Sequence, residues 1–520
     1  MENVKLRKSW ILALLIALFC AFACMLPRAA LAADGDVVIE DEVQRGGIKI
    51  RKLVPIFGGS TAEGDTVVEG TKFTIELAQG NSVYVGGSWY GVGQVICTIV
   101  SEADGWATTP NNYLPYGTYI VREQSVNDGQ YPAMIGDTAW SKTVVVHSDN
   151  TIVDAGSVTN DMWRSTISVI KKDVETNNAQ GDADLSNAIF TVYNRSDAPI
   201  RYRDANGTYH NVGVDEAIPD TMVTDINGYA ELPYDSLEYG TYEVVETTPP
   251  HKENGELMYL PQSPAWSSGE IELHEKSMNV ETDNCANRIV RGGLRLTKYD
   301  LERDGAIPQG DGSLNAEFSI INMSPKPVLV NGRLCQTNEV CYVMRADRET
   351  GAWSCGGTTL PYGTYKVIES QAAAGYHKDG DWSYTFSVRT DGTIYSPTQV
   401  ESNKNQVIRG GVQVIKLDAN SDLSRPQGDG NFDDIEITIT NESNHSILYQ
   451  GHEVQPQGVV TKIYMNDGVA HTTRQDLPYG RYSLKETDVP ATTGYRLNPM
   501  WNPTVVISNQ DQWATVLITP

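Results

Sequence analysis

The chain has 520 residues, and its 66 acidic residues outnumber its 40 lysines and arginines, which gives a formal net charge of −26 at pH 7. Nucleic acid is therefore not an expected partner, because binding phosphates requires clustered Lys and Arg. The length exceeds that of one ordinary hydrophobic core, so several domains are expected.

The first 32 residues have the three-part layout of a secretory signal peptide. Basic residues precede an apolar run over residues 10–26, and Ala-Leu-Ala follows at 30–32. Pro27 ends the apolar run, which is short for the ~20 apolar residues of a membrane helix. We expect a secreted chain that begins at Ala33, with residues 33–45 as an N-terminal extension. An uncleaved anchor helix and a lipid attached to Cys24 are the alternative interpretations.

Four segments of the remaining chain repeat one pattern with a period of about 120 residues. Each begins with a short apolar strand and ends its second half with a run close to Leu-Pro-Tyr-Gly-Thr-Tyr. Between the two lies a Gln-Gly-Asp turn at 180–182, 309–311 and 427–429, with Glu-Gly-Asp at 63–65. A period of this length fits an independent domain. Short runs of Val, Ile, Thr and Tyr that alternate with polar residues predict an all-β sandwich. We predict four such domains in tandem, over residues 46–160, 165–287, 291–405 and 410–520.

The opening strand of each repeat places a lysine on its apolar face. Side chains of a strand alternate between two faces, so Ile167, Val169 and Lys171 share one face. The same parity holds in every repeat, and the four lysines are Lys52, Lys171, Lys298 and Lys416.

A glutamate and an asparagine recur with each lysine. In the later strand the alternation of Tyr242, Val244 and Glu246 puts a carboxyl group on the aromatic face. The four glutamates are Glu123, Glu246, Glu369 and Glu486. An asparagine falls near the end of the last strand of each of the first three repeats, eleven positions before the next lysine, at Asn160, Asn287 and Asn405.

The three residue types together predict a self-cross-linking reaction. Burial disfavours the charged forms, so the lysine becomes an amine nucleophile and the glutamic acid keeps its proton. The acid then polarises the asparagine amide and transfers the proton that lets ammonia leave, which joins Lys and Asn by an amide bond. The alternative interpretation is a buried salt bridge with an amide beside it.

These motifs resemble the B-type repeats of the collagen adhesin Cna and the SpaA-like pilin domains of Gram-positive bacteria. The resemblance covers residues ~46 to 520 and rests on three marks: the V-x-K-x-D opening strand, as at 169–173, the Y-G-x-Y-x-x-x-E run and the terminal asparagine. It implies prealbumin-like, reverse-immunoglobulin sandwiches that serve as a stalk, pilus shaft or adhesin module. It also implies isopeptide bonds, no cofactor, and partners among cell-wall and other surface proteins or the host matrix.

Two repeats depart from the family pattern. In the first, Val54 stands where the Asp of V-x-K-x-D is expected. In the fourth, Pro520 stands where the asparagine is expected, which leaves Lys416 without its partner. Three isopeptide bonds are therefore predicted. The sequence contains no Leu-Pro-x-Thr-Gly sortase motif or C-terminal anchor, and we expect a truncated reading frame. A protein that is released, or held at the bacterial surface without a covalent link, is the alternative.

Five cysteines follow the leader, and three of them lie close together in the third repeat. In an oxidising compartment we expect one disulfide among Cys335, Cys341 and Cys355. No metal site is predicted, because no CxxC pair occurs and the calcium-loop-like start at 418–422 is followed by Leu423 where Gly is required.

Three classes of function remain to be weighed. The leading one is a structural surface protein, and the alternative is an adhesin whose first domain or Trp-rich loops, at Trp89, Trp106 and Trp140, bind a host matrix or glycan ligand. Enzymatic turnover on an external small molecule is not predicted, because G-x-S-x-G, H-E-x-x-H and P-loop motifs do not occur. The self-cross-linking step is a single turnover.

Overall fold

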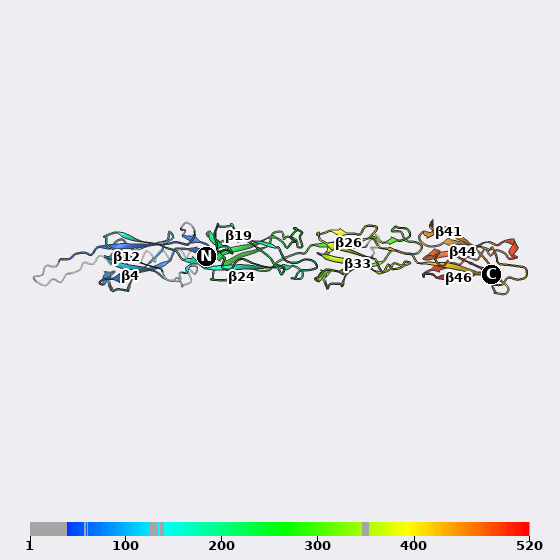
Figure 1. Ribbon diagram of the computed structural model, residues 1–520, viewed down its shortest axis with the longest axis horizontal. Coiled ribbons are helices and arrows are strands. Elements are labelled where there is room, and N and C mark those ends of the chain that lie inside the picture. Colours follow the sequence, from blue (N-terminus) through cyan, green and yellow to red (C-terminus); the bar gives the residue numbers. More distant parts are fainter. Residues whose placement is uncertain are drawn as a thin grey trace, which may run out of the picture. The chain divides into compact units, whose positions relative to one another are not determined.

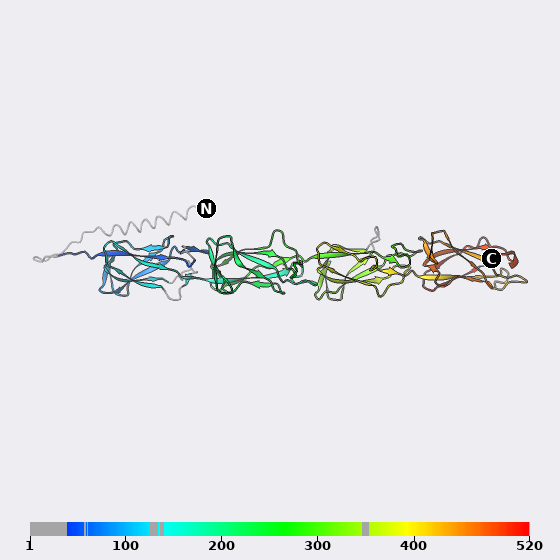
Figure 2. The ribbon, with the colours of Figure 1, turned by 45° about the horizontal axis from the view of Figure 1, so that its top comes forward.

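The structure is a computed structural model that describes residues 39–56, 59, 61–124, 134–135, 140–345 and 353–518. The predicted signal peptide and Pro520 lie outside these ranges. The described chain is built almost entirely of β-strands (Figures 1 and 2), and its one helix is the short 3-10 turn η1 over Ala491–Thr493. A search of the described ranges for helices long and apolar enough to cross a membrane found none. The prediction of an all-β fold is therefore confirmed.

The chain divides into two compact units. The first contains residues 1–52, 69–124 and 138–158, and the second contains residues 53–68, 125–137 and 159–520. The segment 53–68 thus leaves the first repeat and packs with the second unit, where Val54, Ile56 and Val68 form a small apolar cluster with Met162. This exchange was not expected from the repeat pattern.

The first unit holds two four-stranded sheets that enclose one core, which contains Ile48, Phe73 and Tyr119. One sheet joins β1 to β8, β9 and β13, and the other has the order β12-β10-β4-β7. A hairpin of β5 and β6 projects beside them. The strands are β1 (Arg45–Lys52), β4 (Lys72–Gln79), β5 (Val83–Val85), β6 (Ser88–Tyr90), β7 (Val95–Val100), β8 (Trp106–Thr108), β9 (Leu114–Pro115), β10 (Gly117–Glu123), β12 (Ser141–Val146) and β13 (Ile152–Val158).

The second repeat has the same two-sheet plan within the second unit. Strand β15 pairs with four others, and the facing sheet has the order β19-β16-β22-β23. Two short ladders precede it, β2 with β3 and β11 with β14. The strands are β2 (Ala62–Glu63), β3 (Thr66–Val67), β11 (Met134–Ile135), β14 (Asp161–Met162), β15 (Arg164–Asp173), β16 (Ile189–Asn194), β17 (Ile200–Arg203), β18 (Tyr209–Val212), β19 (Ala217–Val223), β20 (Tyr229–Glu231), β21 (Leu237–Glu238), β22 (Gly240–Thr248), β23 (Ser267–Leu273), β24 (Asn279–Glu281) and β25 (Cys285–Asn287).

The third and fourth repeats follow the same plan, with four-stranded sheets of order β31-β28-β33-β34 and β41-β38-β44-β45. In the third, the opening strand is split into β26 and β27, of which β26 is labelled in Figure 1. The third-repeat strands are β26 (Arg291–Leu296), β27 (Tyr299–Asp300), β28 (Glu317–Asn322), β29 (Val328–Val330), β30 (Arg333–Cys335), β31 (Val340–Arg345), β32 (Trp353–Pro361), β33 (Gly363–Gln371), β34 (Ser383–Val388), β35 (Ile394–Tyr395) and β36 (Lys404–Asn405). The fourth-repeat strands are β37 (Arg409–Lys416), β38 (Glu436–Asn441), β39 (Ile447–Tyr449), β40 (His452–Val454), β41 (Val459–Tyr464), β42 (Val469–His471), β43 (Leu477–Pro478), β44 (Gly480–Asp488), β45 (Thr504–Ile507) and β46 (Trp513–Ile518).

The first and last strands of each repeat are parallel neighbours. Strand β1 pairs with β13, β15 with β24 and β25, β26 and β27 with β35 and β36, and β37 with β46. Parallel neighbours end at the same edge of a sheet. The lysine near the end of the first strand and the asparagine at the end of the last strand therefore arrive at one end of the sandwich.

Candidate cross-linking sites

The predicted lysines and glutamates lie inside the sandwiches, as their strand parity requires. The lysines are 0%, 0%, 1% and 5% exposed in chain order, and the glutamates are 6%, 5%, 1% and 1% exposed. Each lysine lies within two residues of the end of the first strand. Each glutamate lies at or near the end of the strand that begins with the glycine of the Tyr-Gly-x-Tyr run. The two sheets thus contribute one ionisable side chain each to a shared apolar interior.

In the second repeat all three predicted residues meet. The Lys171 ammonium nitrogen Nζ lies 2.9 Å from Glu246 Oε1 and contacts the Asn287 side-chain oxygen Oδ1. The Asn287 amide nitrogen Nδ2 donates to Glu246 Oε2 at 2.9 Å and to the carbonyl oxygen of Leu260 at 2.9 Å. One carboxyl group therefore touches both the lysine nitrogen and the amide nitrogen of the asparagine. Cys285 also contacts the lysine, with Sγ 3.1 Å from Nζ.

The third repeat holds a second asparagine that the sequence analysis did not single out. Lys298 Nζ contacts Asn403 Oδ1, while Asn405 Nδ2 donates to Glu369 Oε1 at 2.7 Å. Lys298 Nζ and Glu369 Oε1 are 3.8 Å apart. The strand register explains the difference, because Asp300 pairs with Asn405 just as Asp173 pairs with Asn287, which puts Asn403 at the position of Cys285. A register comparison of the last strands would have found Asn403.

Burial changes the ionisation of the third site. Loss of solvent lowers the pKa of Lys298 to about 8, although the nearby Glu369 carboxylate partly offsets the effect. Loss of solvent also raises the pKa of Glu369, which Lys298 and the Asn405 amide only partly counteract. Both shifts favour the neutral amine and the protonated acid, which is the pair of states that the cross-linking reaction needs.

The first and fourth repeats bring lysine and glutamate together. Lys52 Nζ lies 2.5 Å from Glu123 Oε1, and loss of solvent lowers the pKa of Lys52. Lys416 Nζ lies 2.6 Å from Glu486 Oε1. Asn160 belongs to the second compact unit, so its bond to Lys52 stays a prediction.

The cysteines of the third repeat are free thiols in the structure, so the expected disulfide among them is not formed there. All three are buried, and each has a separate backbone neighbour: Cys335 and Cys341 donate to the carbonyl oxygens of Arg333 and Ile320, and the Cys355 sulfur accepts from the amide of Leu294. Loss of solvent raises the pKa of Cys341 to about 12 and that of Cys355 to about 11, which makes both poor nucleophiles.

The Gln-Gly-Asp turn links one repeat to the next, a role the sequence pattern did not reveal. We call residues 180–182 and 309–311, with 63–65, the docking turns. The Gln180 amide nitrogen binds buried Asp173 of its own repeat at 3.1 Å, and its side-chain oxygen accepts from the backbone amide of Leu329 in the next repeat at 2.7 Å. Gln309, Asp300 and Leu448 repeat this arrangement at the following junction, with 3.1 and 2.8 Å.

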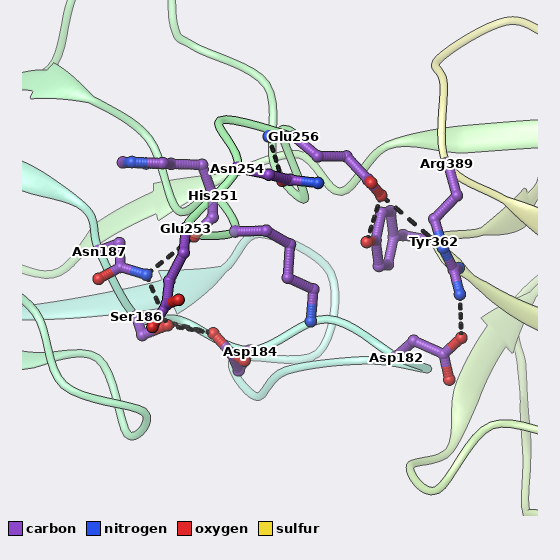
Figure 3. A pocket seen from close by; sticks show the side chains of 11 residues that line it. Asp182, Asp184, Ser186, Asn187, His251, Glu253, Asn254, Glu256, Tyr362 and Arg389 are labelled. Carbon is purple, nitrogen blue, oxygen red and sulfur yellow. Dashed lines mark hydrogen bonds and ion pairs between the residues drawn. The ribbon is translucent and has the colours of Figure 1, made fainter.

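The remaining two residues of a docking turn also reach the next repeat. The Gly181 amide donates to the carbonyl of Pro327 at 3.1 Å, and Asp182 accepts from Thr364 and Arg389, both at 2.7 Å. Figure 3 shows Asp182 facing Arg389 at one side of a pocket of about 620 Å³. On the same side, the hydroxyl of Tyr362, the first tyrosine of the Tyr-Gly-Thr-Tyr run, donates a hydrogen bond to Glu256 at 2.5 Å.

Of the three tryptophans considered for ligand binding, one is on the surface. Trp89 is 68% exposed and its ring lies 5.3 Å from that of Tyr84. Trp106 is half-buried beneath Lys49, with Nζ 4.2 Å from the ring centre, and Trp140 packs against the core of the first unit.

The sequence of two repeats matches the model of a known domain family. The SpaA family model, described as a prealbumin-like fold domain, matches residues 165–253 and 312–402. The sequence matches no curated protein. Among solved structures, the chain is similar to the TIE protein of Bacillus anthracis, at 19% identity over 93% of this chain and 75% of that one, with a TM-score of 0.43. It is also similar to BcpA, the major pilin subunit of Bacillus cereus, at 15% identity over 70% of this chain and 100% of that one, with a TM-score of 0.25. For the full-length major pilin SpaD of Corynebacterium diphtheriae the identity is 12%, over 70% of this chain and 97% of that one, with a TM-score of 0.20.

The family match falls on the second and third repeats, and the same two-sheet plan with parallel first and last strands recurs in the first and the fourth. From these two observations we identify the chain as a repeat protein of the SpaA-like prealbumin fold.

Proposed function

We propose that this chain is a structural protein of a Gram-positive cell surface, a pilin-like stalk or adhesin shaft, whose repeats close themselves with Lys–Asn isopeptide bonds. The observation that carries the proposal is the site of the second repeat, where Glu246 contacts both Lys171 and Asn287 inside the sandwich. The SpaA-like fold supports the pilin-like role.

The geometry supports proton transfer between the two nitrogen atoms through the Glu246 carboxyl group, whose two oxygens lie 2.9 Å from Lys171 Nζ and 2.9 Å from Asn287 Nδ2. The side-chain amine of Lys171 attacks the side-chain carbonyl carbon of Asn287, and the new carbon–nitrogen bond forms as the bond to the amide nitrogen breaks. Glu246 takes a proton from the attacking amine and gives one to the departing nitrogen, which leaves as ammonia. The acid ends in the state in which it began, so the reaction needs no cofactor. Holding the three groups in contact replaces a bimolecular encounter.

An ion pair alone explains less of the arrangement. A buried Lys–Glu pair is often no more stabilising than apolar side chains of the same size. An ion pair also gives no role to the asparagine whose amide nitrogen faces the carboxyl group at 2.9 Å in the second repeat and 2.7 Å in the third. The cross-linking reaction uses all three groups.

A bond at this place would join the first and last strands of a repeat. Lys171 and Asn287 are 116 positions apart and lie on parallel neighbouring strands. Tension applied along the chain would pass through the covalent bond and not through the hydrogen bonds of the sheets. Unlike a disulfide, an amide bond is not broken by reducing agents. These properties suit a secreted stalk whose partners are cell-wall or other surface proteins.

Intact-mass measurement tests the proposal. The purified mature chain is expected to weigh less than its sequence by three ammonia molecules, one for each of the first three repeats. Lys171→Ala is expected to restore one ammonia, and Glu246→Gln should do the same because the proton shuttle is lost. Lys172→Ala, the neighbouring lysine outside the site, is the matched control and should leave the deficit at three.

A folded chain at its full unmodified mass would overturn the cross-linking part of the proposal. Peptide mapping then locates each bond, since a cross-linked pair of peptides replaces two linear ones. A cross-linked peptide pair from the first repeat would show whether Lys52 and Asn160 form their bond.

A second candidate function rests on the exposed aromatic pair Trp89 and Tyr84. Exposed aromatic side chains are frequent anchors in binding surfaces. An adhesin that binds a host matrix or glycan through this hairpin would lose binding in Trp89→Ala, whereas Trp106→Ala would have little effect. An array of matrix proteins and glycans probed with the secreted chain discriminates this function from a stalk without a ligand.

A further inference from the structure

The last strand of each repeat places one side chain directly opposite the lysine of the first strand. We call these side chains the facing residues, and all four are buried. The register of the parallel strands gives the pairs Lys52 with Val158, Lys171 with Cys285, Lys298 with Asn403 and Lys416 with Ile518. The third pair follows from the pairing of Tyr299 with Lys404 one position further along.

The distance from the lysine nitrogen Nζ to the glutamate oxygen Oε1 follows the hydrogen-bonding strength of the facing residue. Opposite the apolar Val158 and Ile518 it is 2.5 and 2.6 Å. Opposite the Cys285 thiol it is 2.9 Å, and opposite the Asn403 amide it is 3.8 Å. Apolar side chains offer the lysine no hydrogen bond, a thiol offers a weak one and an amide oxygen a strong one. The series indicates that the facing residue competes with the glutamate for the amine.

Cys285 leaves the lysine of the second repeat beside its reaction partners. Its Sγ lies 3.1 Å from Lys171 Nζ, yet the amine still contacts Asn287 Oδ1 and lies 2.9 Å from Glu246 Oε1. The distance to Glu246 falls within the roughly 2.6–3.2 Å over which a side chain exchanges a proton. The attacking amine of this repeat is therefore in place.

Asn403 holds the lysine of the third repeat away from the carboxyl group. Lys298 Nζ donates to Asn403 Oδ1, and at 3.8 Å from Glu369 Oε1 it lies beyond hydrogen-bond distance. Asn405 still donates to Glu369 at 2.7 Å, so the leaving nitrogen is in place. The Asn405 oxygen Oδ1 is buried and has no hydrogen-bond partner among the described residues, whereas the matching oxygen of Asn287 contacts its lysine.

The Asn403 side chain satisfies only one half of its amide in this position. Its nitrogen Nδ2 is buried and has no hydrogen-bond partner within the described part of the chain. A buried donor without a partner lowers stability. An apolar side chain in place of Asn403 would remove this unpaired donor, so such a variant is expected to fold.

We propose that the facing residue sets the rate at which a repeat closes its cross-link, and that Asn403 delays the bond of the third repeat by holding the amine of Lys298. This inference rests on the proposed cross-linking reaction and adds a positioning residue to it. Lys298 must leave Asn403 before it reaches the side-chain carbonyl carbon of Asn405, whereas Lys171 starts beside its target. In both repeats the same bond forms and ammonia leaves, so the difference lies in the step before the attack. One hydrogen bond of this kind is worth about a tenfold change in rate.

A time course of bond formation in the full chain tests the proposal. Cell-free synthesis is stopped, and samples taken at successive times are quenched in acidic denaturant and digested with trypsin. Mass spectrometry then quantifies the cross-linked peptide pairs of the second and third repeats from the same molecules. Trypsin cuts after Lys404, so a bond to Asn405 is distinguished from a bond to Asn403. The second repeat is expected to close about tenfold faster than the third.

Exchange of the facing residues makes the test specific. Asn403→Cys and Asn403→Val should each speed the bond of the third repeat to about the rate of the second. Cys285→Asn should slow the bond of the second repeat by about tenfold. Cys285→Val is the matched control, because it removes the thiol without adding an amide and should leave this bond fast. A loss of stability cannot explain a gain in rate, and limited proteolysis of the same samples reports whether each variant is folded.

The outcomes separate this proposal from the reaction on which it rests. Equal rates in the second and third repeats, rates that none of the exchanges changes, or a bond from Lys298 to Asn403 would overturn the role of the facing residue and leave the cross-linking reaction in place. A chain in which no repeat loses ammonia would overturn the proposed function, and the role of the facing residue with it.

Discussion

Lys298 and Glu369 form a buried pair in which burial acts against both charges. Loss of solvent lowers the pKa of Lys298 to about 8 and raises that of Glu369. The neutral pair is therefore accessible near neutral pH, as the nucleophile and the proton shuttle of an amide-forming reaction require. At the residue scale, burial in the apolar interior shifts both pKa values toward the neutral forms, and the fold holds the two groups close to each other.

The pKa of Lys298 predicts how stability depends on pH when the cross-link is absent. In an Asn405→Ala chain, Lys298 is neutral in the folded state above about pH 8 and stays charged in the unfolded state up to about pH 10.5. Unfolding then takes up a proton, so the free energy of unfolding rises with pH between these values, by roughly 3 kcal/mol. Denaturant titrations at pH 8 and pH 10 measure the rise. The double variant with Lys298→Met should lack it, and equal slopes in the two proteins would contradict the prediction.

Two asparagines in the third repeat compete for Lys298. Asn405 is bound to the proton shuttle Glu369, whereas Asn403 contacts Lys298 at the position that Cys285 holds in the second repeat. We expect Asn405 to form the bond, because only its leaving nitrogen faces the carboxyl group. Intact mass should show that Asn405→Ala retains one ammonia more than the unmodified chain and that Asn403→Ala does not. The opposite result would assign the bond to Asn403.

At the scale of elements, the docking turn depends on the residue two positions after the buried lysine of each opening strand. Asp173, Asp300 and Asp418 are buried and hold the glutamine of their turn. The first repeat has Val54 there, and its turn has Glu63 in place of glutamine. Glu63 accepts instead from the amide of Ile56 at 3.1 Å and from Arg201 at 2.8 Å. In the first repeat, the loss of the buried aspartate at Val54 is thus accompanied by the replacement of the turn glutamine by Glu63.

Glu63 shares Arg201 with a second buried carboxylate. Glu238 accepts from the Arg201 side chain at 2.9 Å, from the Arg201 backbone amide at 2.8 Å and from Arg164. Loss of solvent, together with the neighbouring Glu238, raises the pKa of Glu63 to about 9, which Arg201 only partly counteracts.

This carboxyl pair predicts that the segment 53–68 binds the second repeat less tightly as pH rises. Glu63 keeps its proton in the folded state up to about pH 9 and loses it near pH 4.5 when the segment is released. Release therefore gives up a proton, so its free energy falls with rising pH between these values. Hydrogen exchange of residues 61–68, corrected for intrinsic rates, should accelerate from pH 6 to pH 9. Glu63→Gln should remove the pH dependence, and exposed Glu69→Gln is the control. Unchanged protection across this range would refute the prediction.

At the scale of the whole molecule, each proposed cross-link would close a loop that contains most of a repeat. Loop closure over 116 positions lowers the entropy of the unfolded chain, and the estimate written for disulfides gives roughly 4 to 5 kcal/mol per bond. The effect belongs mainly to the repeat that contains the bond, because the first, second and fourth repeats each have a core cluster of their own. The core of the third repeat also includes Ala183, Leu185 and Met258 from the second.

Removal of one bond is therefore expected to lower one unfolding transition. In calorimetry, Asn287→Ala should shift the transition of the second repeat to lower temperature by roughly 10 °C or more, whereas exposed Asn279→Ala should not. Reducing agent should leave the unmodified chain unchanged. A transition temperature equal to that of the unmodified chain would mean that the bond contributes little to stability.

The sequence by itself determined the all-β repeats and the interior position of four lysines and four glutamates. Both follow from strand parity, which is a property of the local backbone and needs no partner segment. The tertiary structure decided the rest: Asn403 enters the third site through the register of β27 and β36, and Cys335, Cys341 and Cys355 stay apart as thiols. It also decided the role of the Gln-Gly-Asp turns, because their partners Leu329 and Leu448 lie 149 and 139 positions further along the chain. Contacts over such separations depend on how folded repeats pack against each other, which a pattern within one repeat does not encode.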